Sequence, residues 1–273
     1  MECVKLDHLY QLQEKGHSSK GNQLKVRDGR YWYKADYMGY EGLAEYMVSN
    51  LLKHSSIKNF VKYDLVRIEC KEKIYHGCKS ENFLKDGENL ITLEHLYRQY
   101  TGRGLARQIA QIEETEDRIS FVVKVVEDIT GLKKFGEYLT AMLELDAFFL
   151  NEDRHMNNIA VIYNKEKRQY RTCEYFDHGL ALLADTMVDF ALEKTVEECI
   201  DHIEAKPFSR SFDEQMDAAE KIYGQQLFLQ FDIKTVLELL QRCEELYGTK
   251  ICSRVEKILR YQMRKYRYLF KTC

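Results

Sequence analysis

The sequence has 273 residues, and its hydrophobic content of 45% is enough to bury a sizeable core in one bilobed domain or two small ones. With 41 basic and 44 acidic residues, its formal net charge is −3. This balance argues against direct nucleic-acid binding, which needs a concentrated positive field. The longest apolar runs are five residues, so we expect no membrane span and no secretion signal. The eight cysteines lack metal-ligand spacing, which favours reduced thiols and a cytoplasmic location, with secretion into a host by a dedicated system left open.

The N-terminal third is predicted to be rich in strands. Asp28-Gly29 lies between apolar runs and predicts a hairpin of strands 23–26 and 31–35. A helix over 40–53 and a second hairpin, 65–70 with 74–78, follow. From about residue 89 the pattern is helical, with an embedded hairpin of 159–163 and 169–176. The helices are expected at 119–129, 133–150, 194–205, 213–223, 233–247 and 250–270. This order predicts an α+β fold, with a small β-rich lobe over 1–85 and a larger, mostly helical lobe over 86–273.

The last predicted helix carries several basic residues, beginning with Arg254. Its apolar residues, such as Val255, Ile258 and Leu259, keep helical spacing, so the basic residues are expected on the exposed face. A surface for RNA or for an acidic partner is the less favoured alternative.

The segment 151–158 joins a long apolar helix to a strand and carries Asp153 and Asn158, five positions apart. Further on, a strand ends in Phe176-Asp177-His178-Gly179. One carboxylate can accept the proton of an acceptor hydroxyl, while an asparagine and a second carboxylate offer the hard oxygen ligands that Mg²⁺ prefers. Asp, Asn and Gly are also ordinary turn residues, so this spacing needs support from other elements.

That support comes from the N-terminal third. Lys34 lies in the middle of a predicted strand and could reach nucleotide phosphates. Glu45 on the next helix is a natural partner for this lysine, and Glu41, one turn earlier on the same face, is the competing candidate. A polar loop bracketed by Gly16 and Gly21 precedes the first hairpin, where backbone amides could approach phosphate oxygens.

Together these residues resemble a known family. The string Asp153-Arg154-His155-x-x-Asn158, followed by Phe176-Asp177-x-Gly179, resembles HipA-type bacterial kinases and, beyond them, phosphatidylinositol kinases. Ser18-x-x-Gly21-x-Gln23-x-Lys25 resembles the HipA-type phosphate loop, and Ala44-Glu45-Tyr46 resembles a helix of that family, which favours Glu45 over Glu41. The resemblance runs from about 16 to 180, with weaker similarity through 205–208.

The resemblance implies a bilobed protein-kinase-like fold that uses ATP and Mg²⁺. It implies that Asp153 is the catalytic base and that Asn158 and Asp177 hold Mg²⁺. His155 either contacts the transferred phosphate or packs beneath its loop. The residues expected to bind the nucleotide are Ser18, Ser19, Lys20, Gly21, Lys34, Glu45, Asn158 and Asp177, with the adenine hinge expected at 78–83.

The expected reaction is phosphorylation of Ser or Thr hydroxyls of a protein substrate, together with autophosphorylation, for which Ser18 is the expected position. The alternatives are a lipid or small-molecule kinase of the phosphatidylinositol-kinase type, or a nucleotide-binding module without catalysis. HipA toxins carry an additional N-terminal subdomain, for which we expect no room before residue 16. An antitoxin or other regulatory partner is therefore left open.

Overall fold

The computed structural model describes residues 2–7 and 23–270. These residues form two compact units. Unit 1 comprises the described residues of 1–82, 177–202 and 229–273, and unit 2 comprises 83–176 and 203–228. The segments 177–202 and 229–273 thus group with the N-terminal sheet in unit 1.

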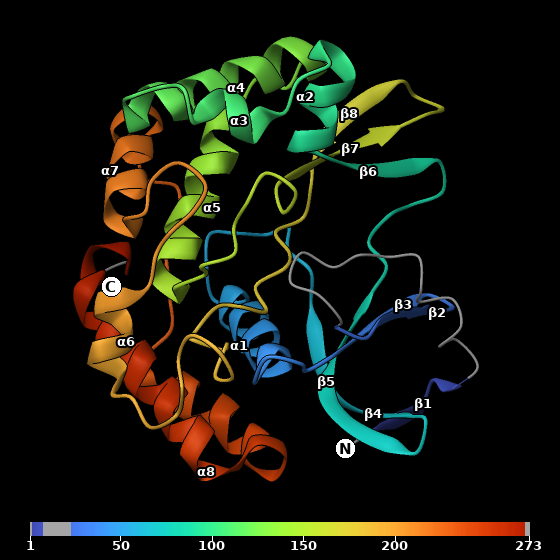
Figure 1. The fold of residues 1–273 in the computed structure, drawn as a ribbon, viewed down its shortest axis with the longest axis vertical. Coiled ribbons are helices and arrows are strands. Elements are labelled where there is room, and N and C mark those ends of the chain that lie inside the picture. The colour runs from blue at the N-terminus through green and yellow to red at the C-terminus, as the bar shows by residue number, and fades with distance from the viewer. Residues whose placement is uncertain (1, 8–22, 271–273) are drawn as a thin grey trace. The chain divides into compact units, whose positions relative to one another are not determined.

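Unit 1 contains a five-stranded sheet with the order β1-β4-β5-β3-β2 (Figure 1). Only β1 pairs in parallel, with β4, and the other neighbours are antiparallel. Gly29 adopts a φ of 56°, which is the left-handed backbone expected in the predicted Asp-Gly turn. The strands are β1 (Cys3–Lys5), β2 (Lys25–Asp28), β3 (Tyr31–Ala35), β4 (Tyr63–Cys70) and β5 (Lys73–Glu81).

Helix α1 (Glu41–Leu52) packs against β4 and β5, and every one of its residues is buried. Two glycines permit close packing here, Gly42 between α1 and β5, and Gly77 between β5 and β3. A Cβ at Gly42 would lie 2.7 Å from the Cα of Gly77, and a Cβ at Gly77 would collide with the carbonyl of Lys34. The helix therefore lies close against β5, the strand that pairs with β3, which carries the candidate lysine.

The rest of unit 1 is formed by the 177–202 segment and the C-terminal helices α6 (Val196–His202), α8 (Ile233–Lys265) and the 3₁₀ turn η2 (Arg267–Leu269). Gly248 has a φ of 72° and interrupts α8, close to the break predicted between 247 and 250. Arg254 departs from the prediction of an exposed basic face, since it is only 6% exposed. Its guanidinium donates to the carbonyls of Phe190 and Lys194, which explains its burial.

Unit 2 combines an antiparallel sheet, β6-β7-β8, with packed helices α4, α5 and α7. Strand β6 was not predicted, because its short apolar run leads directly into the helical pattern of α2. Helix α5 is almost completely buried, including Glu144 and Asp146 among its apolar residues. The strands are β6 (Glu88–Thr92), β7 (Ala160–Asn164) and β8 (Gln169–Thr172). The helices are α2 (Leu93–Thr101), α3 (Leu105–Ile109), α4 (Thr115–Thr130), α5 (Phe135–Phe149) and α7 (Phe212–Tyr223).

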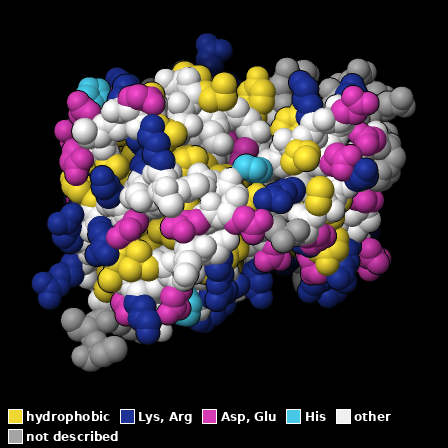
Figure 2. Space-filling view, turned by 90° about the horizontal axis from the view of Figure 1, so that it is seen from below, with side chains coloured by type: hydrophobic (Ala, Val, Ile, Leu, Met, Phe, Trp, Pro, Cys, Tyr) yellow, Lys and Arg dark blue, Asp and Glu magenta, His cyan; other side chains and the backbone are white. Residues whose placement is uncertain are grey.

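The charged side chains are mixed in sign on the face drawn in Figure 2, where acidic and basic groups alternate. This mixture agrees with the net charge of −3. Among the described residues, no helix is both long enough and apolar enough to span a membrane.

Candidate active site

Unit 1 brings together three residues that the sequence singled out. The Nζ of Lys34 lies 2.5 Å from Oε1 of Glu45 and 2.7 Å from Oδ1 of Asp177. Lys34 is 8% exposed, and burial alone would lower the pKa of its ammonium. The two carboxylates outweigh burial and raise the pKa of Lys34 well above its ordinary value. The lysine therefore stays protonated, and its ammonium is held between two carboxylates.

The structure pairs Lys34 with Glu45 and uses Glu41 differently. Glu45 is 1% exposed, and its Oε2 accepts a hydrogen bond of 2.9 Å from the backbone N–H of His178. The carboxylate of Glu41 instead accepts the backbone N–H groups of Tyr37, Met38 and Gly39, in the turn that leads to Tyr40 and the helix. Glu41 thus shapes the turn into α1, whereas Glu45 orients the lysine.

Asp177 has a φ of 62°, in the left-handed region that few residues other than glycine occupy. Aspartate tolerates this backbone better than most side chains, and such strain is concentrated at functional sites. A second cation lies nearby, because Lys25 of β2 is directly opposite Lys34 in the sheet register. The like charge of Lys34 is the main cause that lowers the pKa of Lys25. An anion beside Lys34 would relieve this repulsion.

In unit 2 the predicted catalytic loop lies between α5 and β7, and Arg154 organises it. Arg154 is fully buried, and it forms a two-point ion pair with Asp146 of α5, with Nε–Oδ2 at 2.8 Å and Nη2–Oδ1 at 3.0 Å. Its Nη1 also donates to the carbonyls of Asn158, at 2.9 Å, and Phe176, at 3.1 Å. One side chain therefore anchors the loop and the residue that immediately precedes Asp177 in the chain.

The loop presents Asp153, His155 and Asn158. The Nδ2 of Asn158 donates to the carbonyl of Asp153 at 2.9 Å, so its amide oxygen is the atom suited to binding a metal. The Nε2 of His155 lies 3.8 Å from Oδ2 of Asp153, and its Nδ1 accepts the backbone N–H of Asn157. His155 is partly exposed, whereas its neighbour Arg154 is fully buried.

Lys206 is a site residue for which the sequence analysis assigned no role. Its Nζ lies 3.7 Å from Oδ1 of Asp153. The two residues are far apart in the chain, and the only signal was the weak family similarity at 205–208. Lys206 therefore lies beside Oδ1 of Asp153, and His155 lies beside Oδ2.

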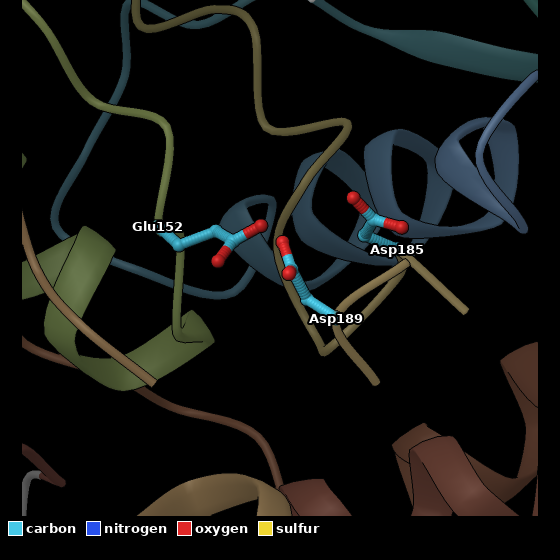
Figure 3. A group of neighbouring side chains, drawn as sticks. All are labelled: Glu152, Asp185 and Asp189. Carbon is cyan, nitrogen blue, oxygen red and sulfur yellow. The ribbon is translucent and has the colours of Figure 1, made fainter. Parts of the chain in front are cut away.

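Figure 3 shows three acidic side chains that the sequence analysis did not consider: Glu152 from the loop after α5, and Asp185 and Asp189 from the 177–202 segment. Carboxylate oxygens of Asp185 and Asp189 lie within 4.8 Å of each other in unit 1. Asp185 also accepts the backbone N–H of Val188 at 3.0 Å. We attribute this pair to the turn over 185–190.

The predicted phosphate-loop residues Ser18, Ser19, Lys20 and Gly21 lie outside the described residues. The donors suited to Mg²⁺ are an amide oxygen at Asn158 and a carboxylate at Asp177, which are the hard oxygen ligands that this ion requires. Each of these oxygens is by itself a donor that suits Mg²⁺, and in unit 1 Lys34 lies beside Asp177 as a charge for phosphate oxygens.

No protein-family model and no curated protein matches the sequence. Among solved structures, the chain is similar to the proinflammatory kinase CtkA of Helicobacter pylori, with a TM-score of 0.66 and 14% identity, over 97% of this chain and 96% of that one. It also matches HipA of Shewanella oneidensis MR-1, solved with HipB and operator DNA, with a TM-score of 0.46 and 12% identity, over 92% of this chain and 65% of that one.

At this level of identity the likeness to CtkA concerns the fold. The chain has a protein-kinase-like α+β fold, with a curled N-terminal sheet and a mostly helical remainder. The fold class predicted from the sequence is confirmed.

Proposed function

We propose that the protein is an ATP- and Mg²⁺-dependent phosphotransferase that phosphorylates Ser or Thr hydroxyls of a protein substrate. The observation that carries the proposal is the ion-paired group of Lys34, Glu45 and Asp177. A buried strand lysine that is held by a helix glutamate and an aspartate provides a preoriented cation for nucleotide phosphates.

The catalytic loop supplies the second part of the proposed chemistry. Asp153 accepts the proton of the acceptor hydroxyl while the hydroxyl oxygen bonds to the γ-phosphorus. The bond from that phosphorus to the bridging oxygen breaks, and ADP leaves. When bound, Mg²⁺ neutralises phosphate charge, and Asn158 and Asp177 are the residues that would hold it. Lys206 lies beside Asp153 and adds positive charge where the transferred phosphoryl group carries negative charge.

The proposal extends to autophosphorylation of Ser18 in the glycine-bracketed loop. A phosphate at this position adds about −1.5 to −2 charges at pH 7. Repulsion from the nucleotide phosphates would then weaken ATP binding, so Ser18→Asp should bind ATP more weakly than Ser18→Ala.

Incubation with γ-labelled ATP and Mg²⁺, alone and with cell lysate, tests the proposal. We expect label on Ser or Thr side chains of a protein, identified by mass spectrometry. Label confined to lipid or to small alcohols would reject the protein-kinase assignment. Nucleotide binding without transfer to any acceptor would reject catalysis.

A further inference from the structure

A pocket of about 360 Å³ lies in unit 2 beside the catalytic loop. Most of its wall is apolar, and its two basic residues are Lys206 and Arg118. The lining residues are Ala106, Ile109, Ala110, Arg118, His155, Met156, Lys206 and Pro207.

The pocket and the candidate base share two neighbouring residues. Two of its lining residues, His155 and Lys206, also lie within 4 Å of the Asp153 carboxylate, at 3.8 and 3.7 Å. A molecule that places one group in the pocket would therefore place the next covalently attached group close to Asp153.

The wall beside Lys206 is held by side chains from two helices. Gln215 of α7 is fully buried, donates from Nε2 to the carbonyl of Lys206 at 3.1 Å, and accepts the N–H of Phe208 at 3.3 Å. Arg118 of α4 donates from Nη1 to the carbonyl of Phe208 at 2.6 Å. Because these hydrogen bonds already fix the backbone of the wall, binding of a ligand should cost little conformational entropy in the protein.

We propose that this pocket is the acceptor subsite of the enzyme and takes an apolar side chain of a protein substrate, next to the Ser or Thr that is phosphorylated. This inference rests on the proposed function. At about 30 Å³ for each water-sized group, the pocket holds roughly a dozen heavy atoms. That capacity fits one side chain with its backbone, whereas a long acyl chain exceeds it.

Peptides test the inference. Each carries one Ser as the acceptor and differs only in its neighbours, which are Leu, Met, Phe, Gly, Asp or Lys. At one of the neighbouring positions, we expect kcat/KM to be at least about ten-fold higher for peptides with Leu, Met or Phe than for peptides with Gly, Asp or Lys. This is the discrimination expected when an apolar pocket binds or loses one apolar side chain. Ala110→Trp and Ala106→Phe fill the pocket and should remove this preference by raising KM for the apolar peptide.

Arg107→Trp is the matched control, because Arg107 is an exposed residue of α3 that does not line the pocket. This variant should keep the preference. Thermal unfolding of all three variants shows which of them fold.

The outcomes separate the two proposals. If peptides are phosphorylated in an Asp153-dependent way without any apolar preference, or if folded Ala110→Trp and Ala106→Phe behave like Arg107→Trp, the subsite is wrong and the kinase assignment stands. If phosphatidylinositol vesicles are phosphorylated and peptides are not, the peptide ligand is wrong. If no acceptor is phosphorylated, the proposed function fails first.

Discussion

Lys34 is a strand lysine whose ammonium is buried between two carboxylates, where most strand lysines reach solvent. Burying a charge in this way is unfavourable unless it is paired, and breaking one partner of such a group leaves an uncompensated charge. A cation held in this way is preoriented for phosphate. The two glutamates of α1 test this interpretation, because Glu45 contacts Lys34 whereas Glu41 contacts the backbone before the helix.

Glu45→Gln should lower the rate of phosphoryl transfer on the order of 100-fold, because the lysine loses the charge that orients it. Glu41→Gln should leave transfer within a few-fold of wild type and instead cost about 2 kcal/mol of unfolding free energy, since Glu41 accepts three backbone N–H groups. Turnover and denaturant unfolding of both variants decide the assignment. Equal losses of turnover would contradict it.

Asp177→Asn keeps the shape of the side chain and removes its charge. Because Mg²⁺ couples this carboxylate to the nucleotide in the proposed site, ATP affinity should fall on the order of ten-fold or more with Mg²⁺ present, and less without it. Titration of a fluorescent ATP analogue in Mg²⁺ and in EDTA measures both values. The same loss in both buffers would count against Asp177 as a metal ligand.

At the scale of elements, Arg154 connects α5, the candidate catalytic loop and the segment after β8 at Phe176. Arg154→Met should therefore cost about 3–5 kcal/mol of unfolding free energy, since it leaves the Asp146 charge buried without its ionic partner. The double variant Arg154→Met/Asp146→Leu should recover part of this loss. Denaturant titration compares them, and a double variant no more stable than the single one would contradict this explanation.

Asp36 links three elements of unit 1. It follows β3, accepts the N–H of Gly42 at the start of α1, and accepts the hydroxyl of Tyr247 of α8. Burial, followed by the charge of Glu41, raises the pKa of Asp36 from 3.8 to about 7. Between these values the folded state retains a proton that the unfolded chain has released, so stability should fall as the pH rises from about 4 to 7.

Asp36→Asn removes this titration and should flatten the pH profile, with a difference on the order of 3 kcal/mol between pH 4 and pH 8. Unfolding free energies at these two pH values measure the effect. Parallel profiles for the variant and wild type would show that Asp36 does not titrate in this range.

Much of the secondary structure was predictable from local patterns. The Asp28-Gly29 hairpin and the break in the C-terminal helix at Gly248 follow from turn chemistry and spacing. Strand β6 was missed because a short apolar run next to a helix has no period of its own. Arg254 was wrongly predicted to be exposed, because its partners are backbone carbonyls whose positions cannot be predicted from the sequence.

The residues of the candidate site were likewise predictable only in part from the sequence. Asp153, Asn158 and Asp177 were found because their spacing has a chemical meaning within one stretch of chain. The choice of Glu45 over Glu41 needed the family resemblance, because both lie on one face of α1. Lys206 was given no role, since only the folded chain brings it within 3.7 Å of Asp153.

At the scale of the whole molecule, the chain has a protein-kinase-like fold, and each of its two units carries some of the residues that we propose for phosphoryl transfer. Fold alone does not establish activity, because one fold supports many functions. The claim depends on Asp153 acting as a base while the residues that bind nucleotide remain intact.

The most direct measurement compares wild type with Asp153→Asn for transfer from γ-labelled ATP and, in the same samples, for nucleotide affinity. We predict that transfer to Ser or Thr falls by about 10²- to 10⁴-fold while the affinity for Mg²⁺-ATP is unchanged. An Asp153→Asn variant that keeps most of the wild-type turnover would contradict the account.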